Sequence, residues 1–133
     1  MNQQRLEPVI SIRLKGTGQT HVFHPGDTLS GVVEIQPDEV VKCRQVVVSV
    51  GWHTEGRGDS NAMSMHEDII PVTEISPEMP LQHQFDVVLP YEPWSYAGTL
   101  IRIVWMVHVK VDIAFGTDMN QWLPFVLEPA PVE

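Results

Sequence analysis

The stretch "TLIRIVWMVHVKVDIAF" (residues 99–115) carries the clearest structural signal in the chain. Apolar side chains occupy every second position: Ile101, Ile103, Trp105, Val107, Val109, Val111, Ile113 and Phe115. A β-strand places alternate side chains on one face, whereas an α-helix would spread these eight around its whole circumference. The stretch therefore predicts a strand about three times the usual length. We expect so long a strand to bend or to pair with different neighbours along its length.

The period of two recurs along the rest of the chain. It predicts strands near residues 8–14, 20–24, 27–36, 42–53, 68–75, 83–90 and 121–127. Pro71 lies inside the 68–75 segment, so we expect that strand at a sheet edge, and a polar loop is expected over 54–67. No segment has the pattern of an amphipathic helix. The chain therefore predicts an all-β antiparallel sandwich or barrel.

A corner precedes the third predicted strand, in "HPGDTLSGVVEI" (residues 24–35). Pro25 and Gly26 suit the two central positions of a type II turn. Such a turn does not match the twist of a tight hairpin, so we expect the chain to change direction here, between sheets. Gly31 leaves a gap in the apolar row of the strand. We expect it to accept a bulky neighbour such as Trp52 or Trp105, or to mark a bulge.

Length and composition predict a single domain over residues 1–133, with a proline-rich tail at 128–133 that frays. Eight basic residues face 17 acidic ones, for a net charge of -9. Such a surface repels phosphate backbones and anionic lipids, so nucleic acid and membrane surfaces are poor partners. No apolar run is long enough for direct membrane insertion. Cys43 is the only cysteine and no signal-peptide pattern is present, which favours a cytoplasmic location.

The sequence predicts no catalytic, metal or cofactor site. Ser95 lies in "PWSYAG", which is not the Gly-x-Ser-x-Gly elbow of a hydrolase. Cys43 is expected to be a small buried hydrophobe. The six histidines lack the paired spacing that zinc sites show: His66-Glu67-Asp68 is one short polar run without spaced partners, and His53, His83 and His108 could converge only through the fold.

Six residues are candidates for a protein-interaction surface: Arg57, Asp59, Met63, Met65, Trp94 and Tyr96. The first two belong to an Arg-Gly-Asp tripeptide in a segment rich in turn formers, where an ordinary loop is the simpler interpretation. The methionines next to it could make adaptable contacts with a partner. The two aromatic residues either contact a partner or cover the end of the core.

Three segments together resemble arrestin-type domains: "FHPGDTLSGVVEI", "KCRQVVVSVGWHTE" and "FDVVLPYEPWSYAGTLIRIVWMVHVKVDI". They follow the family's order and cover most of residues 20–113. The residues that match the last and most telling segment are Phe85, Leu89, Pro90, Pro93, Ser95, Tyr96, Gly98, Ile103, Trp105 and Val107. The chain is similar to one N-terminal-type arrestin domain, a fold also found in the retromer's arrestin-like subunit and in bacterial sporulation-control proteins.

The resemblance implies an immunoglobulin-like sandwich that works as a non-catalytic adaptor or scaffold and binds protein partners. Binding would use sheet edges or end loops. The basic groove by which receptor-binding arrestins sense phosphates has no counterpart among the lysines and arginines here, so phosphoreceptor recognition is not carried over. Two alternatives remain open, a self-associating homo-oligomer and a module that binds a small ligand or metal.

Overall fold

The computed structural model describes residues 9–16, 21–56, 61–97 and 101–129, and this part of the chain contains β-strands and no helix. The strands are β1 (Val9–Leu14), β2 (Val22–Phe23), β3 (Thr28–Gln36), β4 (Val41–Gly56), β5 (Ala62–Ile70), β6 (Glu74–Ile75), β7 (Leu81–Val88), β8 (Tyr96–Ala97), β9 (Ile101–Ile113) and β10 (Met119–Leu127). Accordingly, no described segment forms a helix that could cross a membrane.

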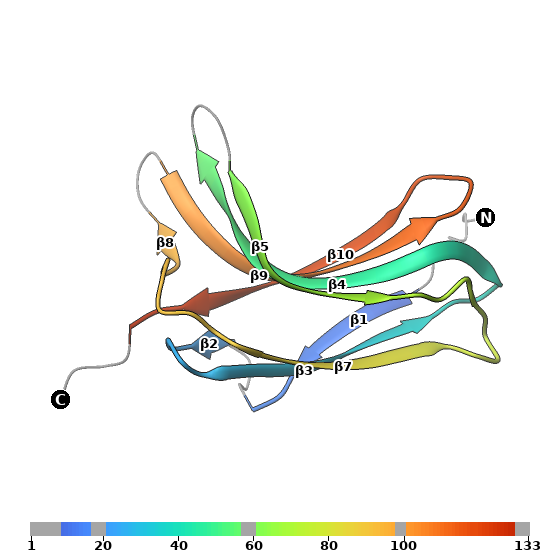
Figure 1. Cartoon of the computed structure of the whole chain (residues 1–133), viewed down its shortest axis with the longest axis horizontal. Helices are drawn as coiled ribbons and strands as arrows, with labels where there is room; N and C mark the ends of the chain where they lie inside the picture. The colour runs from blue at the N-terminus through green and yellow to red at the C-terminus, as the bar shows by residue number, and fades with distance from the viewer. Residues whose placement is uncertain (1–8, 17–20, 57–60, 98–100, 130–133) are drawn as a thin grey trace, which may run out of the picture.

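The strands form two stacked sheets (Figure 1). The small sheet has the order β1-β3-β7, and the large sheet has the order β2-β10-β9-β4-β5, with β6 added to β4 and β8 added to β9. Neighbours are antiparallel except β2 and β10, which are parallel. The expected fold class, a two-sheet antiparallel sandwich, is confirmed.

The two longest strands shape the large sheet. β9 pairs with β4 from end to end, and its other side pairs first with β8 and then with β10. Figure 1 shows β4 and β9 bending away from the small sheet at their ends near β8, so the outer face of the large sheet is concave there. The expectation that the 99–115 stretch bends and pairs with different neighbours is confirmed.

Alternate side chains of both sheets meet in one core between them. Its largest fully buried side chains are Trp105, Leu29, Ile35, Ile75, Leu89 and Leu127. The core also buries the valines at 46, 48 and 50 of β4 and those at 107, 109 and 111 of β9, as their alternation predicted. Phe115 is an exception, because β9 ends at Ile113 and leaves the Phe115 side chain 97% exposed.

The corner at residues 24–27 has the predicted geometry. Gly26 has a φ of 86°, and the Asp27 amide donates a hydrogen bond to the carbonyl of His24 at 3.0 Å. The turn carries the chain from β2 in the large sheet to β3 in the small sheet, which confirms the change of direction between sheets. The gap at Gly31 holds a bulky ring, but it is Phe85 and neither predicted tryptophan: a Cβ at Gly31 would lie 2.7 Å from that ring.

The segment after β4 differs from the prediction. The expected polar loop over 54–67 is largely strand, since β4 continues to Gly56 and β5 begins at Ala62. The single strand expected over 68–75 is divided: β5 ends at Ile70, before Pro71, and β6 begins at Glu74. A proline cannot donate to a strand ladder, so it separates the two. Both pieces pair with β4.

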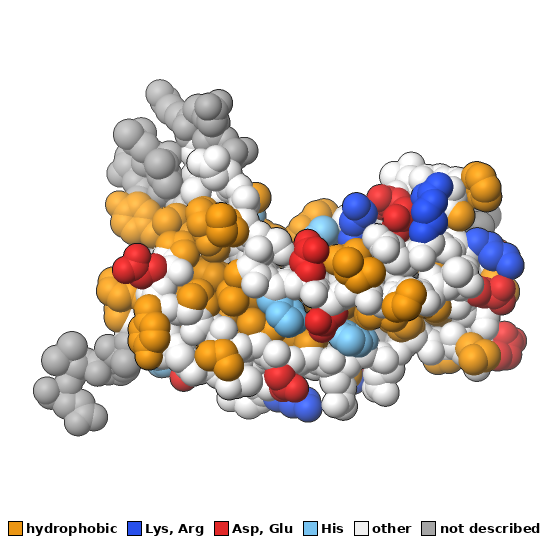
Figure 2. All heavy atoms as spheres, in the orientation of Figure 1, with side chains coloured by type: hydrophobic (Ala, Val, Ile, Leu, Met, Phe, Trp, Pro, Cys, Tyr) orange, Lys and Arg blue, Asp and Glu red, His pale blue; other side chains and the backbone are white. Residues whose placement is uncertain are grey.

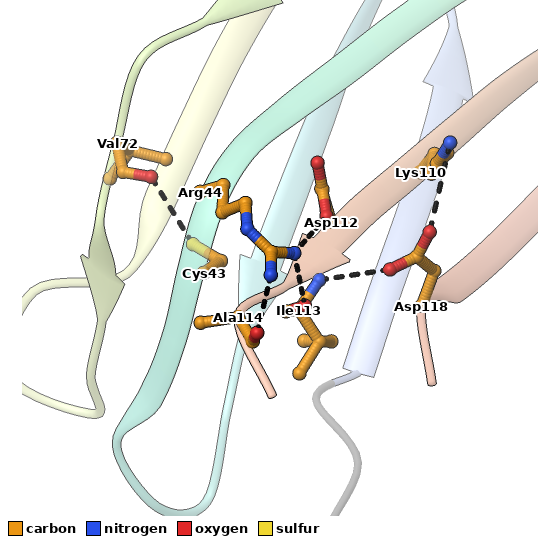
Figure 3. A network of polar contacts seen from close by, with 8 residues as sticks. All are labelled: Cys43, Arg44, Val72, Lys110, Asp112, Ile113, Ala114 and Asp118. Carbon is orange, nitrogen blue, oxygen red and sulfur yellow. Dashed lines mark hydrogen bonds and ion pairs between the residues drawn. The ribbon is translucent and has the colours of Figure 1, made fainter. Parts of the chain in front are cut away.

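Arg44 stabilises the C-terminal end of β9 through hydrogen bonds (Figure 3). The register of β4 on β9 skips Arg44, which therefore lies in a bulge beside Cys43. Its guanidinium donates to Asp112 Oδ1 at 3.0 Å and to the carbonyls of Ile113 and Ala114 at 2.9 and 2.6 Å. This arginine thus satisfies carbonyls where the ladder ends.

Candidate functional site

A groove of about 990 Å³ crosses the concave outer face of the large sheet. The outline of the molecule dips at this place in Figure 2. Small residues of β4 and β5 form part of its floor, where Gly51 lies opposite Ser64 and His53 lies opposite Ala62. Larger apolar side chains of the outer face line the rest, namely those of Val104, Met106 and Trp122. The groove has the size and the apolar lining of a binding site.

One wall is an aromatic pair. Trp122 of β10 stacks on His108 of β9, with ring centroids 5.0 Å apart and planes 3° from parallel. His108 Nε2 donates to Asn120 Oδ1 at 2.8 Å, which holds the imidazole in place. The Trp122 side chain remains 52% exposed. A fixed, exposed ring loses little conformational entropy on binding and offers a large contact area.

Opposite charges neutralise one another at the end of the groove near β8. Glu55 of β4 lies 2.6 Å from His53 Nε2 and forms an ion pair with Arg102 of β9. The hydrogen bond from His53, followed by the contacts with Arg102, lowers the pKa of the Glu55 carboxyl. Because the acid and the arginine are paired, the groove suits an apolar segment better than a free ion.

The segment before β8 is braced, so that Tyr96 is held beside the groove. The Ser95 amide donates to the carbonyl of Leu127 at 2.8 Å, and the Leu127 amide donates back to Ser95 Oγ at 3.0 Å. Trp105 reaches from the core to the same segment, donating from Nε1 to the carbonyl of Pro93 at 2.7 Å. Tyr96, 58% exposed, pairs with Ile103 in the β8–β9 ladder.

Two of the six candidate interaction residues line the groove. Met63 of β5 and Tyr96 of β8 both belong to its lining, but their register opposite Trp52 and Ile103 directs their side chains to the other face of the sheet. Met65 is exposed on β5 but outside the groove lining, and Trp94 is exposed just before β8. Arg57 and Asp59 lie outside the described residues.

The sequence analysis did not single out His108 or Trp122, although they form one wall of the site. The available signal was Trp122 on the outward face of the predicted 121–127 strand, opposite the apolar row of Leu123, Phe125 and Leu127, since a large ring on an outward face is unusual there. Their contact could not be anticipated, because it joins two strands whose register only the fold supplies.

A polar cluster closes the open side of the sandwich between β5 and β7. Asp68 accepts from His66 Nε2 at 3.0 Å and from His83 Nε2 at 2.9 Å. Figure 2 shows histidine and acidic side chains along this seam. Partial burial raises the pKa of Asp68, but the hydrogen bonds and charges of the two histidines outweigh it, and the net shift is downward. Among the described residues, no group of three or more His, Cys, Asp or Glu is arranged to hold a metal ion.

The two nucleophile types named in the sequence have structural roles. Cys43 is buried, as predicted, and its thiol donates to the carbonyl of Val72 at 3.3 Å. Burial, followed by the nearby Asp112 carboxylate, raises the pKa of this thiol, which disfavours the nucleophilic thiolate. The Ser95 hydroxyl is occupied by the Leu127 amide.

The sheet orders and the corner between the sheets define an immunoglobulin-like sandwich of the arrestin type. A solved structure with this arrangement is that of Spo0M, a sporulation control protein from Bacillus subtilis, which matches 93% of this chain with a TM-score of 0.70. The two sequences are 15% identical, and the match covers 50% of the Spo0M chain, so this chain spans about half the length of that protein. No family model and no curated protein sequence matches the chain. The likeness supports the distant arrestin-like fold expected from the sequence.

Proposed function

We propose that this chain is a non-catalytic protein-interaction module, an adaptor or scaffold in the cytoplasm, which binds an apolar segment of a partner in the groove of the large sheet. The observation that carries the proposal is the groove itself. It joins residues of β4, β5, β8, β9 and β10 on one concave surface, with the apolar and aromatic side chains of Val104, Met106 and Trp122 open to solvent on its outer face.

The chemistry of the lining supports a protein segment as the ligand. Met106 has a flexible, polarizable side chain that adapts to different apolar surfaces. The Trp122 ring is held by His108 and offers the rigid aromatic contact typical of interaction hot spots. Ser49 and Ser64 add hydroxyl groups that can hydrogen-bond to a peptide backbone.

A regulatory or interaction role also agrees with the fold likeness to a sporulation control protein. Fold alone does not determine function, so the proposal rests on the groove. Its non-catalytic part is supported by the buried Cys43 thiol and by the hydroxyl of Ser95, which already accepts a backbone hydrogen bond.

Affinity capture with matched variants tests the proposal. The wild-type chain and the Trp122→Ala and Phe115→Ala variants are used as bait in lysate from cells that make the protein. Trp122 lines the groove, whereas Phe115 is an equally removable exposed ring that does not. We expect a partner that the wild type and Phe115→Ala capture and that Trp122→Ala captures at least about tenfold less, because truncating an aromatic hot spot generally costs 2 kcal/mol or more. Equal capture by all three baits would contradict binding in the groove.

A further inference from the structure

We propose that β5 accepts an added strand from the partner, and that this strand carries apolar and basic side chains on the face it shares with the groove. The inference rests on the proposed function, since it names the kind of segment that the module binds and how its backbone is held. β5 is the last strand of the large sheet and pairs with β4 alone. Outside that ladder, no described backbone hydrogen bond involves residues 62–69.

β5 has a register shift near Met65 and an inward-pointing Asp68, but it lacks other features that protect an edge strand from pairing. Such strands are usually short, covered, or interrupted by lysine or proline. β5 has nine residues, and its sequence "AMSMHEDII" contains neither lysine nor proline. Met63 and Ile69 are 56% and 57% exposed on it. A long edge that pairs on one side alone and exposes two apolar side chains is a template for one more strand.

The neighbouring edge is less suited to the same role. β7 ends the small sheet on the same side of the sandwich, but two of its outward polar side chains are already engaged with β3. Gln82 donates to Glu34 Oε2 at 3.1 Å, and Asp86 accepts from Ser30 Oγ at 2.5 Å. In contrast, β5 is continuous with the groove, because Ala62, Met63 and Ser64 belong to the groove lining.

Charge determines which strand fits. In the register with β4, Ile69 and Glu67 follow one another on the outer face of the sheet. From Val46 to Ile101 the sequence has one base, Arg57, against eight acids. A strand added beside β5 would therefore place an apolar side chain next to Ile69 and a lysine or arginine next to Glu67. A second copy of β5 would bring like charges together, in a chain of net charge -9, so a basic partner is favoured over self-pairing.

The test uses a labelled nine-residue peptide, Thr-Val-Thr-Lys-Thr-Lys-Thr-Val-Thr, which reads the same in both directions. Its control replaces both lysines with glutamates. Binding to the full chain is measured by fluorescence anisotropy, and the bound region is located by amide hydrogen exchange. We expect the lysine peptide to bind more tightly than the glutamate peptide, and to slow exchange in residues 61–70.

A charge-reversal variant sharpens the test. Glu67→Lys should weaken binding of the lysine peptide about five- to tenfold and should strengthen binding of the glutamate peptide. The matched control is Glu78→Lys, which makes the same charge change at an exposed position outside β5 and the groove lining, and should leave the preference unchanged. Circular dichroism verifies that both variants fold.

The outcomes separate this inference from the proposed function. Absence of binding by the lysine peptide, or equal binding with Glu67→Lys and Glu78→Lys, would overturn the added-strand inference. Slowed exchange in the β9 and β10 residues of the groove, without protection of 61–70, would also overturn it while supporting the groove as a binding site. Dimerisation of the free chain through residues 61–70 would overturn the inference of a basic partner, because a second copy of the chain would then be the added strand.

Discussion

Gly51→Ala is the substitution whose effect the structure specifies most closely. Gly51 lies in β4 at the floor of the groove, where the register on β5 shifts. A Cβ at this position would lie 2.1 Å from the carbonyl oxygen of Met63 and 2.9 Å from Cα of Ser64. The three nearest atoms all belong to the backbone of β5, so no side-chain rotation can relieve the overlap. The strand itself must move.

The expected cost follows from the kind of contact. Overfilling a packed site usually costs about 1–3 kcal/mol, and a clash with backbone belongs at the upper end, about 3 kcal/mol. Domains of this size are typically stable by about 5–15 kcal/mol, so Gly51→Ala should still fold. Its melting temperature should fall by roughly 12 °C. Amide exchange should accelerate most in β5, because β5 is held to the sheet by β4 alone.

Chemical denaturation gives the free energy of unfolding, and hydrogen exchange locates the loss. The control is Gly116→Ala, where the nearest atom to a new Cβ is the Cγ2 methyl of the Ile113 side chain at 3.3 Å. The free energy of unfolding of that variant should fall by less than about 1 kcal/mol. Should Gly51→Ala be as stable as Gly116→Ala, or should exchange accelerate equally in all strands, the close approach of β4 and β5 described above is wrong.

Three further predictions concern groups outside the groove. The pKa of Asp68 is lowered in the folded chain. Its contribution to the free energy of unfolding is therefore complete above the ordinary carboxyl pKa of about 4 and is lost as the pH falls through the lowered value. Denaturation midpoints measured from pH 6 to 3 should show this loss in the wild type and not in Asp68→Asn. Arg44→Ala should lower the free energy of unfolding by about 1–3 kcal/mol, because it leaves two carbonyls and a carboxylate without their donor. Hydrogen exchange should accelerate around Ile113. The control Lys42→Ala, which removes an exposed ion pair, should have little effect. Cys43 should react with a thiol reagent only as fast as the chain opens, since its thiol is buried and its pKa is raised; fast reaction in native buffer would contradict this.

The sequence was sufficient for the strands that have one buried and one outward face. In β9, for example, Trp105 and the valines after it are buried at every second position, and this period is visible without a structure. The Pro25-Gly26 corner was also predictable from the sequence, because proline fixes φ and glycine accepts the positive φ of a type II turn.

β5 escaped prediction for identifiable reasons. Its inward positions include His66 and Asp68, which bond to each other at the open side of the sandwich, so the strand has no apolar row. A shift of register near Met65 further disrupts its alternation. An edge strand with polar inward residues reads as a loop, although the fold pairs it over its whole length.

The groove could not be predicted because it depends on the curvature and register of strands far apart in the chain. Trp122 and His108 come together only when β10 pairs with β9, and Tyr96 joins them only through the short strand β8. Likewise, the contact between His83 and Asp68 joins the edges of two different sheets. Spacing along the sequence contains none of this information.

Site-specific photo-crosslinking tests the central claim, that a partner binds in the groove, most directly. A benzophenone side chain is introduced at Val104, which lines the groove, and in a second protein at Phe115, which is exposed outside it. After irradiation in the cells that make the protein, the account predicts a discrete protein adduct from position 104 that is absent from position 115 and is lost when Trp122→Ala is added. Equal adducts from both positions, or an adduct from position 104 that persists with Trp122→Ala, would contradict it.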